Sequence, residues 1–149
     1  MKAGRGERPG RVVVQTLQPE HYSLQAAATH DFASFAAAEL AARRELGYPP
    51  FSRLIMLRFE GPDAAAVAAL AADAARALRL RADGRFGVLG PAPAAIERLR
   101  QRHRHHILVR GAQGALLRQV VGEALPELRA AARPKDIRVI VDVDPQQML

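Results

Sequence analysis

From residue 52 onwards, the sequence predicts an α+β domain in which a four-stranded antiparallel sheet carries two helices on one face. Three observations predict it. Apolar and polar residues alternate in short segments, two longer segments have apolar residues at three- and four-residue spacing, and the segments follow the order β-α-β-β-α-β. This order is that of the ferredoxin-like, split β-α-β fold.

The residues before this domain predict a strand followed by helices. Arg11 to Leu17, RVVVQTL, is a β-branched run typical of a strand buried on both faces. From about Tyr22 to Leu46 apolar residues recur at helical spacing, and GYPP, Gly47 to Pro50, ends the helical pattern. We place a domain boundary here, between residues 1–49 and 50–149. Because no partner strand follows RVVVQTL, we expect this strand to belong to a larger domain.

The first half of the domain contains two strands and a helix. SRLIMLRFE, Ser52 to Glu60, alternates between two faces as a strand does. Pro62 and Asp63 then open an Ala-rich helix that runs to about Ala82. Phe86 to Leu89 is a short apolar strand, which we expect GPAP to close.

The second half repeats the pattern. HHILVR, His105 to Arg110, is a strand, an amphipathic helix follows from Leu116 to Leu128, and IRVIVDVD, Ile137 to Asp144, is the last strand. Alternation along the strands also predicts which residues occupy the sheet face away from the helices. These are Leu54, Met56, Arg58, Leu108, Arg110, Arg138, Ile140 and Asp142.

Composition narrows the classes of function. The net charge of +7 favours an anionic partner such as nucleic acid, although the arginine and alanine bias of a GC-rich genome also produces basic chains. The absence of cysteine excludes disulfides, a thiol nucleophile and cysteine-ligated zinc. Since no apolar run reaches the length of a membrane span, we expect a cytoplasmic, nucleoid-associated protein without a membrane partner.

The basic stretch ERLRQRHRHH, from Glu97 to His106, is the strongest candidate site. Its arginines stand at alternate positions, so on one strand they would share a face and extend the uncovered side of the sheet or form a rim beside it. Guanidinium groups suit phosphate, whereas the alternative is a solvated hairpin or edge strand whose charges prevent aggregation. The predicted DNA-contacting residues are Arg98, Arg100, Arg102, Arg104 and Arg110, with His106 and Arg58 as secondary candidates.

Catalytic and metal-binding interpretations are weaker. His103 and His105 share a strand face, but a zinc site needs three or four convergent ligands and no third lies beside them in the sequence. Asp142 and Asp144 also share a face, yet a final strand that ends in Asp-Pro is more simply a stop signal. We therefore predict no catalytic residue, no metal site and no cofactor in this chain.

Several motifs together resemble one family, that of primosomal protein N′, the replication-restart helicases. They are AGRGERPGRVVVQTLQPEH, ELGYPPFSRLIMLRFEG, VLGPAPAAIERLRQRHRHHILVRG and VIVDVDPQQML, which cover essentially the whole chain in order. The resemblance implies a parent protein that is an ATP-dependent 3′-to-5′ DNA helicase using ATP, magnesium and zinc. This chain looks like its C-terminal part, with residues 1–49 the end of the second helicase lobe. Arg5 resembles an arginine that faces nucleotide in the parent.

The resemblance also implies partners. They are forked or single-stranded DNA, the helicase core, single-stranded-DNA-binding protein and other primosome proteins. The main alternative is a protein-interaction module without direct DNA contact, which docks through Leu54, Met56, Leu108 and Ile140 on the uncovered sheet face. A third interpretation, an RNA-binding ribosomal-like protein, rests on the likeness of folds alone.

Overall fold

A computed structural model describes residues 12–145. The chain divides between Gly47 and Tyr48 into two compact units, each of which is described by itself. This division lies two residues before the boundary expected from the sequence. The interpretation of residues 1–49 as the end of a helicase lobe stays a prediction.

The first unit contains two helices within the helical region that the sequence predicted from about Tyr22 to Leu46. Helix α1 spans Tyr22–Thr29 and helix α2 spans Phe32–Glu45. The break lies at His30, whose φ of 57° is left-handed, and the side chain of Asp31 then caps α2 by accepting a hydrogen bond from the backbone N–H of Ser34. Neither helix contains a buried residue.

The strand predicted from Arg11 to Leu17 is wrong for the part that the structure describes. Residues 12–17 form no strand, and Val13 and Leu17 are 81% and 101% exposed. A strand exists only where a neighbour completes its hydrogen bonds, and the described residues provide none here. Arg11 itself lies outside the described residues.

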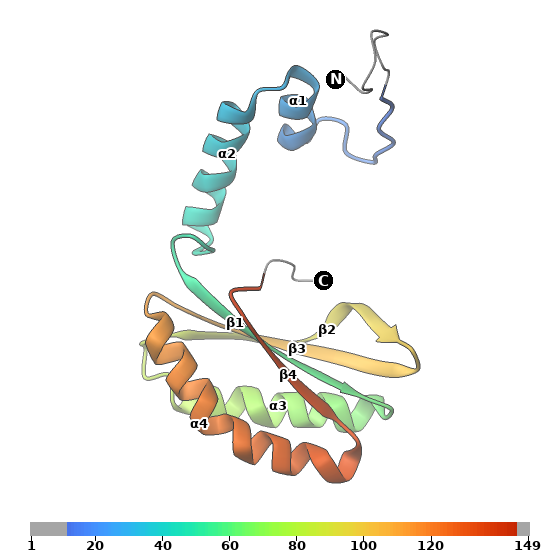
Figure 1. Ribbon diagram of the computed structural model, residues 1–149, viewed down its shortest axis with the longest axis vertical. Helices are drawn as coiled ribbons and strands as arrows, with labels where there is room; N and C mark the ends of the chain where they lie inside the picture. Colours follow the sequence, from blue (N-terminus) through green and yellow to red (C-terminus); the bar gives the residue numbers. More distant parts are fainter. Residues whose placement is uncertain (1–11, 146–149) are drawn as a thin grey trace, which may run out of the picture. The chain divides into compact units, whose positions relative to one another are not determined.

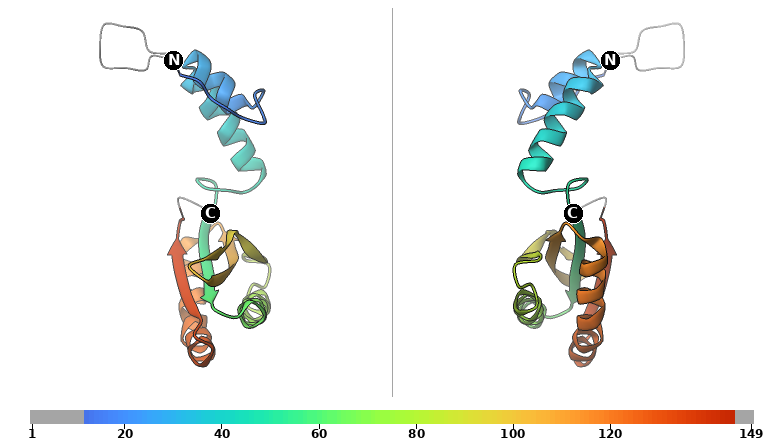
Figure 2. Two further views of the ribbon diagram at one scale, coloured as in Figure 1. Left: turned by 90° about the vertical axis from the view of Figure 1, so that its right-hand side faces the viewer. Right: turned by 90° about the vertical axis from the view of Figure 1, so that its left-hand side faces the viewer.

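The second unit has the predicted ferredoxin-like architecture (Figure 1). Its sheet has the order β2-β3-β1-β4, and every neighbouring pair is antiparallel. Helices α3 and α4 lie on one side of the sheet, and α3 is seen nearly end-on in Figure 2. The elements are β1 (Arg53–Gly61), α3 (Ala64–Leu80), β2 (Gly87–Leu99), β3 (Arg102–Gly111), α4 (Gly114–Ala132), a 3₁₀ turn (Arg133–Lys135) and β4 (Arg138–Val143).

The core lies between the sheet and these helices, on the faces that alternation predicted. Strand β1 contributes Ile55, Leu57 and Phe59, which stand opposite Val109, Ile107 and His105 of β3. The apolar stripes of the helices complete it, with Val67, Leu70, Ala74 and Leu78 from α3 and Leu117, Val120, Val121, Ala124 and Leu128 from α4. Burial of these side chains is the main force that holds the unit together.

Strand β2 is much longer than the four residues expected. Instead of ending at GPAP, it bends at Gly90, whose φ is 90°, and the pairing shifts register between Leu89 and Ala92 and again between Pro93 and Arg98. A Cβ at Gly90 would lie 2.9 Å from the carbonyl oxygen of His106, so only glycine fits this close approach. The bend lets β2 continue alongside β3 as a long hairpin.

Candidate nucleic-acid interface

The arginine-rich stretch is a hairpin and not a single strand. It reverses at Arg100 and Gln101, whose φ angles of 50° and 63° are those that a two-residue hairpin loop requires. Arg98 pairs with His103 and Leu99 pairs with Arg102. Because paired residues share a face and successive residues alternate, Arg98 and Arg102 lie on opposite faces. The expectation that all four arginines extend one face is therefore wrong.

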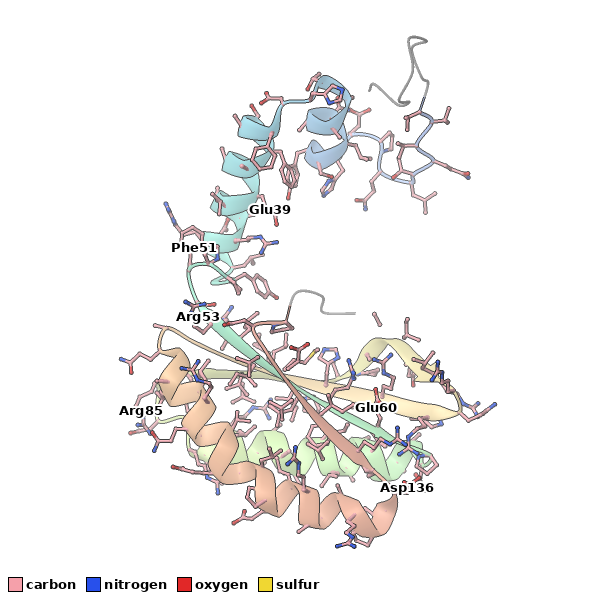
Figure 3. All side chains as sticks on the ribbon, in the orientation of Figure 1. Glu39, Phe51, Arg53, Glu60, Arg85 and Asp136 are labelled. Atoms are coloured by element: carbon pink, nitrogen blue, oxygen red, sulfur yellow. The ribbon has the colours of Figure 1, made fainter. Side chains whose placement is uncertain are left out.

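Arg104 is part of an ion-paired network inside the unit. Arg104 is only 6% exposed, and its Nε donates a hydrogen bond to Oε1 of Glu60 at 3.1 Å. Arg58 Nε lies 2.9 Å from the same carboxylate oxygen, so one carboxylate neutralises part of the charge of two guanidinium groups. Glu60, which belongs to β1, is labelled in Figure 3. The sequence placed Arg104 and Arg58 on an open face, but Arg104 is buried and Arg58 is half-buried, so both are less accessible to phosphate than expected.

Arg102 holds the end of the sheet together. Its guanidinium donates to Oδ2 of Asp136 at 2.9 Å, to the backbone carbonyl of Asp136 and, at 3.0 Å, to the backbone carbonyl of Glu60. Asp136, labelled in Figure 3, precedes β4, and Glu60 belongs to β1. Through these contacts of its two terminal nitrogens, Arg102 connects two segments of the fold, and its charge is offset by Asp136.

Two further candidates lie within the sheet. His106 is half-buried, and burial first, then the charge of His105, lowers its pKa from the ordinary value, so that it carries less positive charge near neutral pH than expected. Arg110 is also half-buried, pairs in register with Leu54 and makes further interactions of its own. Both are weaker candidates than the sequence suggested.

The remaining two arginines of the predicted site, Arg98 and Arg100, lie at the hairpin tip, which we define as residues 96–101. Arg98 and Arg100 are exposed, and neither takes part in an ion pair among the residues that the structure describes. Arg98 donates a hydrogen bond to the side-chain oxygen of Gln101 within the tip. In Figure 1 this hairpin, formed by the yellow and orange strands, closes at one end of the sheet. The tip is therefore the part of the predicted basic site that is open to a polyanion.

Sequence reasoning missed the two acidic residues that divide the arginines into two groups. Glu60 is encoded about forty residues before the basic stretch and Asp136 about thirty residues after it. Only the pairing of β1 with β3, Glu60 opposite Arg104, brings the first of them into place. Alternation along β1 could have placed Glu60 on the same face as Arg58, but it could not indicate the register between the strands.

The apolar docking patch that was expected on the uncovered sheet face is largely buried. Leu54 and Met56 are 1% and 3% exposed, Leu108 is also buried, and Ile140 is half-buried. The expected alternation is right, since Met56 pairs with Leu108 on one side and Asp142 on the other. The expectation that these side chains are exposed to a partner is wrong.

No metal centre is evident in the described part of the chain, where no three His, Asp or Glu residues converge. His103 and His105 each have a buried Nδ1 without a hydrogen-bond partner. Asp144 has a structural role, because its Oδ1 accepts from the backbone N–H of Leu54 and its Oδ2 lies 3.4 Å from Arg53. No helix within residues 12–145 combines the length and the apolarity needed to cross a membrane.

These features define the class of protein: a small α+β domain that presents a basic hairpin tip beside a sheet in which Arg58, Arg102 and Arg104 are ion-paired. The family model of the primosomal protein N C-terminal domain matches residues 44–146. The chain therefore belongs to the primosomal protein N family, as its motifs suggested. Arg5, the predicted nucleotide-facing residue, lies outside the described residues.

Curated relatives agree with this assignment. The replication restart protein PriA of Bacillus subtilis is 31% identical over 148 residues, which are 99% of this chain and 18% of the relative. The protein of the same name from Synechocystis is 41% identical over 73% of this chain and 13% of the relative, and that from Treponema pallidum is 39% identical over 99% and 22%. The chain thus spans less than a quarter of the length of these relatives.

Proposed function

We propose that this chain is a DNA-binding and docking part of a replication-restart protein, and that its hairpin tip contacts backbone phosphates of forked or single-stranded DNA. The family and the printed names of the relatives support the restart role. The observation that carries the DNA contact is the exposure of Arg98 and Arg100 beside neighbouring arginines that are already ion-paired.

The mechanism divides the arginines by task. Arg98 and Arg100 neutralise phosphates and release counterions, which gives affinity without reading base sequence. Arg102 and Arg104 hold the hairpin against β1 and the loop before β4, so that the tip is presented in one orientation. Ordering the tip in advance lowers the entropy cost of binding.

The remaining functions of the family are expected of a longer protein. We propose that ATP hydrolysis with magnesium, zinc binding and strand separation are carried out by parts of the parent outside this chain. In this proposal the chain docks onto that helicase core. Single-stranded-DNA-binding protein and other primosome proteins are further proposed partners.

The test is fluorescence anisotropy of the 149-residue chain with forked, single-stranded and duplex DNA over a series of salt concentrations. We expect Arg98→Ala/Arg100→Ala to flatten the slope of log affinity against log salt by about 1.4 to 1.8 units, because each phosphate contact contributes about 0.7 to 0.9. The matched control is Arg76→Ala/Arg129→Ala, which removes the same charge from exposed positions on α3 and α4.

The two variants separate a local contact from an effect of net charge. Equal slopes for both would mean that the tip is a solvated hairpin, and the protein-interaction alternative would then be favoured. Tighter binding of structured RNA than of forked DNA would instead support the ribosomal-like interpretation.

A further inference from the structure

The hairpin tip carries exposed apolar side chains among its cations. Ile96 is 50% exposed and Leu99 is 47% exposed, and they lie within four residues of Arg100. Purely solvated hairpins that protect a sheet edge carry charges, and apolar side chains there create a risk of aggregation. Phosphate contact alone requires neither residue. Their place beside the two exposed cations, at the turn of the hairpin, is what distinguishes them from other exposed apolar residues such as Leu80.

The fold holds these apolar residues firmly. Nη1 of the buried Arg104 lies 3.5 Å from the backbone carbonyl oxygen of Ile96 in β2. This contact connects β2 to the ion-paired network around Glu60. Leu99 stands opposite Arg102, whose terminal nitrogens donate to Asp136 and to the backbone carbonyl of Glu60. The two apolar side chains are thus presented by backbone that is fixed at both arms.

The backbone at the turn is also costly. Arg100 and Gln101 both adopt positive φ, which residues with a Cβ avoid and for which Asn-Gly would be the usual solution. Strained backbone of this kind concentrates at sites that bind a ligand. A long cation and an amide thus stand where the fold alone would favour Asn-Gly.

We propose that the hairpin tip is a wedge: Leu99 on one face and Ile96, three positions earlier on the other, contact the two bases of an unstacked step, while Arg98 and Arg100 hold the phosphates on either side. This inference rests on the proposed function and specifies which DNA feature is recognised. Apolar side chains inserted between bases have to overcome base stacking, which opposes insertion most strongly in continuous duplex. The cost is smallest where the bases are already unpaired, so the wedge selects the branch point of a fork over uninterrupted duplex.

The test places the fluorescent base analogue aminopurine at the branch point of a fork or in the middle of its duplex arm, at saturating concentrations of the 149-residue chain. We expect fluorescence to rise at the branch point alone, because unstacking relieves quenching. In Ile96→Ser/Leu99→Ser we expect at least about half of that rise to be lost and the preference for fork over duplex to fall by roughly tenfold. The salt dependence of binding should stay unchanged.

Two control variants keep the result specific. Ile96→Met/Leu99→Met retains apolar side chains of similar size and should retain the signal. Leu80→Ser/Val143→Ser removes exposed apolar residues elsewhere in the same unit and should also leave it intact. Circular dichroism melting of each variant shows whether it is folded.

The outcomes distinguish this inference from the proposed function. Binding that depends on the tip arginines, without a fluorescence rise at the branch point, would overturn the wedge and leave DNA binding in place. An absence of binding to any of the DNA forms would overturn both. A rise that survives in Ile96→Ser/Leu99→Ser would also refute the wedge, because other residues would then unstack the bases.

Discussion

Arg100 and Arg104 lie four residues apart on one hairpin but differ in burial and in ion pairing. Arg104 is buried against the carboxylate of Glu60, whereas Arg100 is exposed at the turn without an ion pair among the described residues. The difference comes from the neighbouring strands, since β1 runs beside β3 only as far as the pair Gly61 and His103. Arg104 faces β1 and finds Glu60 there, Arg102 lies just beyond and reaches Asp136 before β4, and Arg100 at the turn has neither acid as a partner. A run of like residues can thus divide into ion-paired members that hold the fold and exposed members that are available to a partner.

The largest effect is expected from removal of the acid that the buried arginines share. Glu60→Ala leaves the buried Arg104 and the half-buried Arg58 without their carboxylate, and we expect the free energy of unfolding to fall by about 3 kcal/mol. Urea unfolding followed by circular dichroism measures it. Asp73→Ala is the control, because it breaks an exposed pair with Arg76 and should cost at most about 1 kcal/mol. Equal losses would show that the Glu60 network is not a scaffold.

A smaller loss of stability is expected when lysine replaces Arg102, because lysine keeps the positive charge but lacks the planar guanidinium group. A lysine in its place cannot reach both Asp136 and the carbonyl of Glu60, so Arg102→Lys should lower the free energy of unfolding by about 1 to 2 kcal/mol. Arg98→Lys should leave stability unchanged. Thermal unfolding compares the two, and a loss in Arg98→Lys as large as that in Arg102→Lys would abolish the distinction between scaffold and tip.

The turn itself should respond in the opposite sense. Arg100→Asn/Gln101→Gly suits positive φ at both positions, so we expect the free energy of unfolding to rise by about 1 kcal/mol. The same variant loses one tip cation, and its salt slope for DNA binding should flatten by about 0.7 to 0.9 units. Unfolding and anisotropy on one sample measure both quantities. A variant that is more stable and binds DNA as the original does would place the contact elsewhere.

The smallest effect concerns pH. The folded-state pKa of His106 is lowered by burial and then by His105, with Arg58 opposite it on β1 and Arg104 beside it on β3. The unfolded chain therefore binds the proton of His106 more readily than the folded chain does. The stability that the folded state has while His106 is neutral is lost as pH falls from about 6.5 through the folded-state pKa. Between about pH 7.5 and pH 5, we expect the original chain to lose slightly more stability than His106→Gln. A greater loss of stability in His106→Gln than in the original chain would show that the pKa of His106 is not lowered by folding.

Much of the fold was predictable because it rests on local patterns. Alternation placed Ile55, Leu57 and Phe59 on the core face, and helical spacing placed the buried stripe from Val67 to Leu78. The start of α3 follows from Asp63, whose side chain accepts a hydrogen bond from the N–H of Ala66. The length of β2 was not predictable in this way, since GPAP has the composition of a turn and continues the strand only through the bend at Gly90.

The sequence by itself determined the order of the elements, the core faces of the strands, the family and the presence of a concentrated basic segment. Only the tertiary structure decided which arginines of that segment are available. The reversal at Arg100 and Gln101 separates Arg98 from Arg102, and strand register brings Glu60 to Arg104 from about forty residues away. The physical reason is that periodicity is a local property of the chain, whereas the neutralisation of a charge depends on partners that folding brings near.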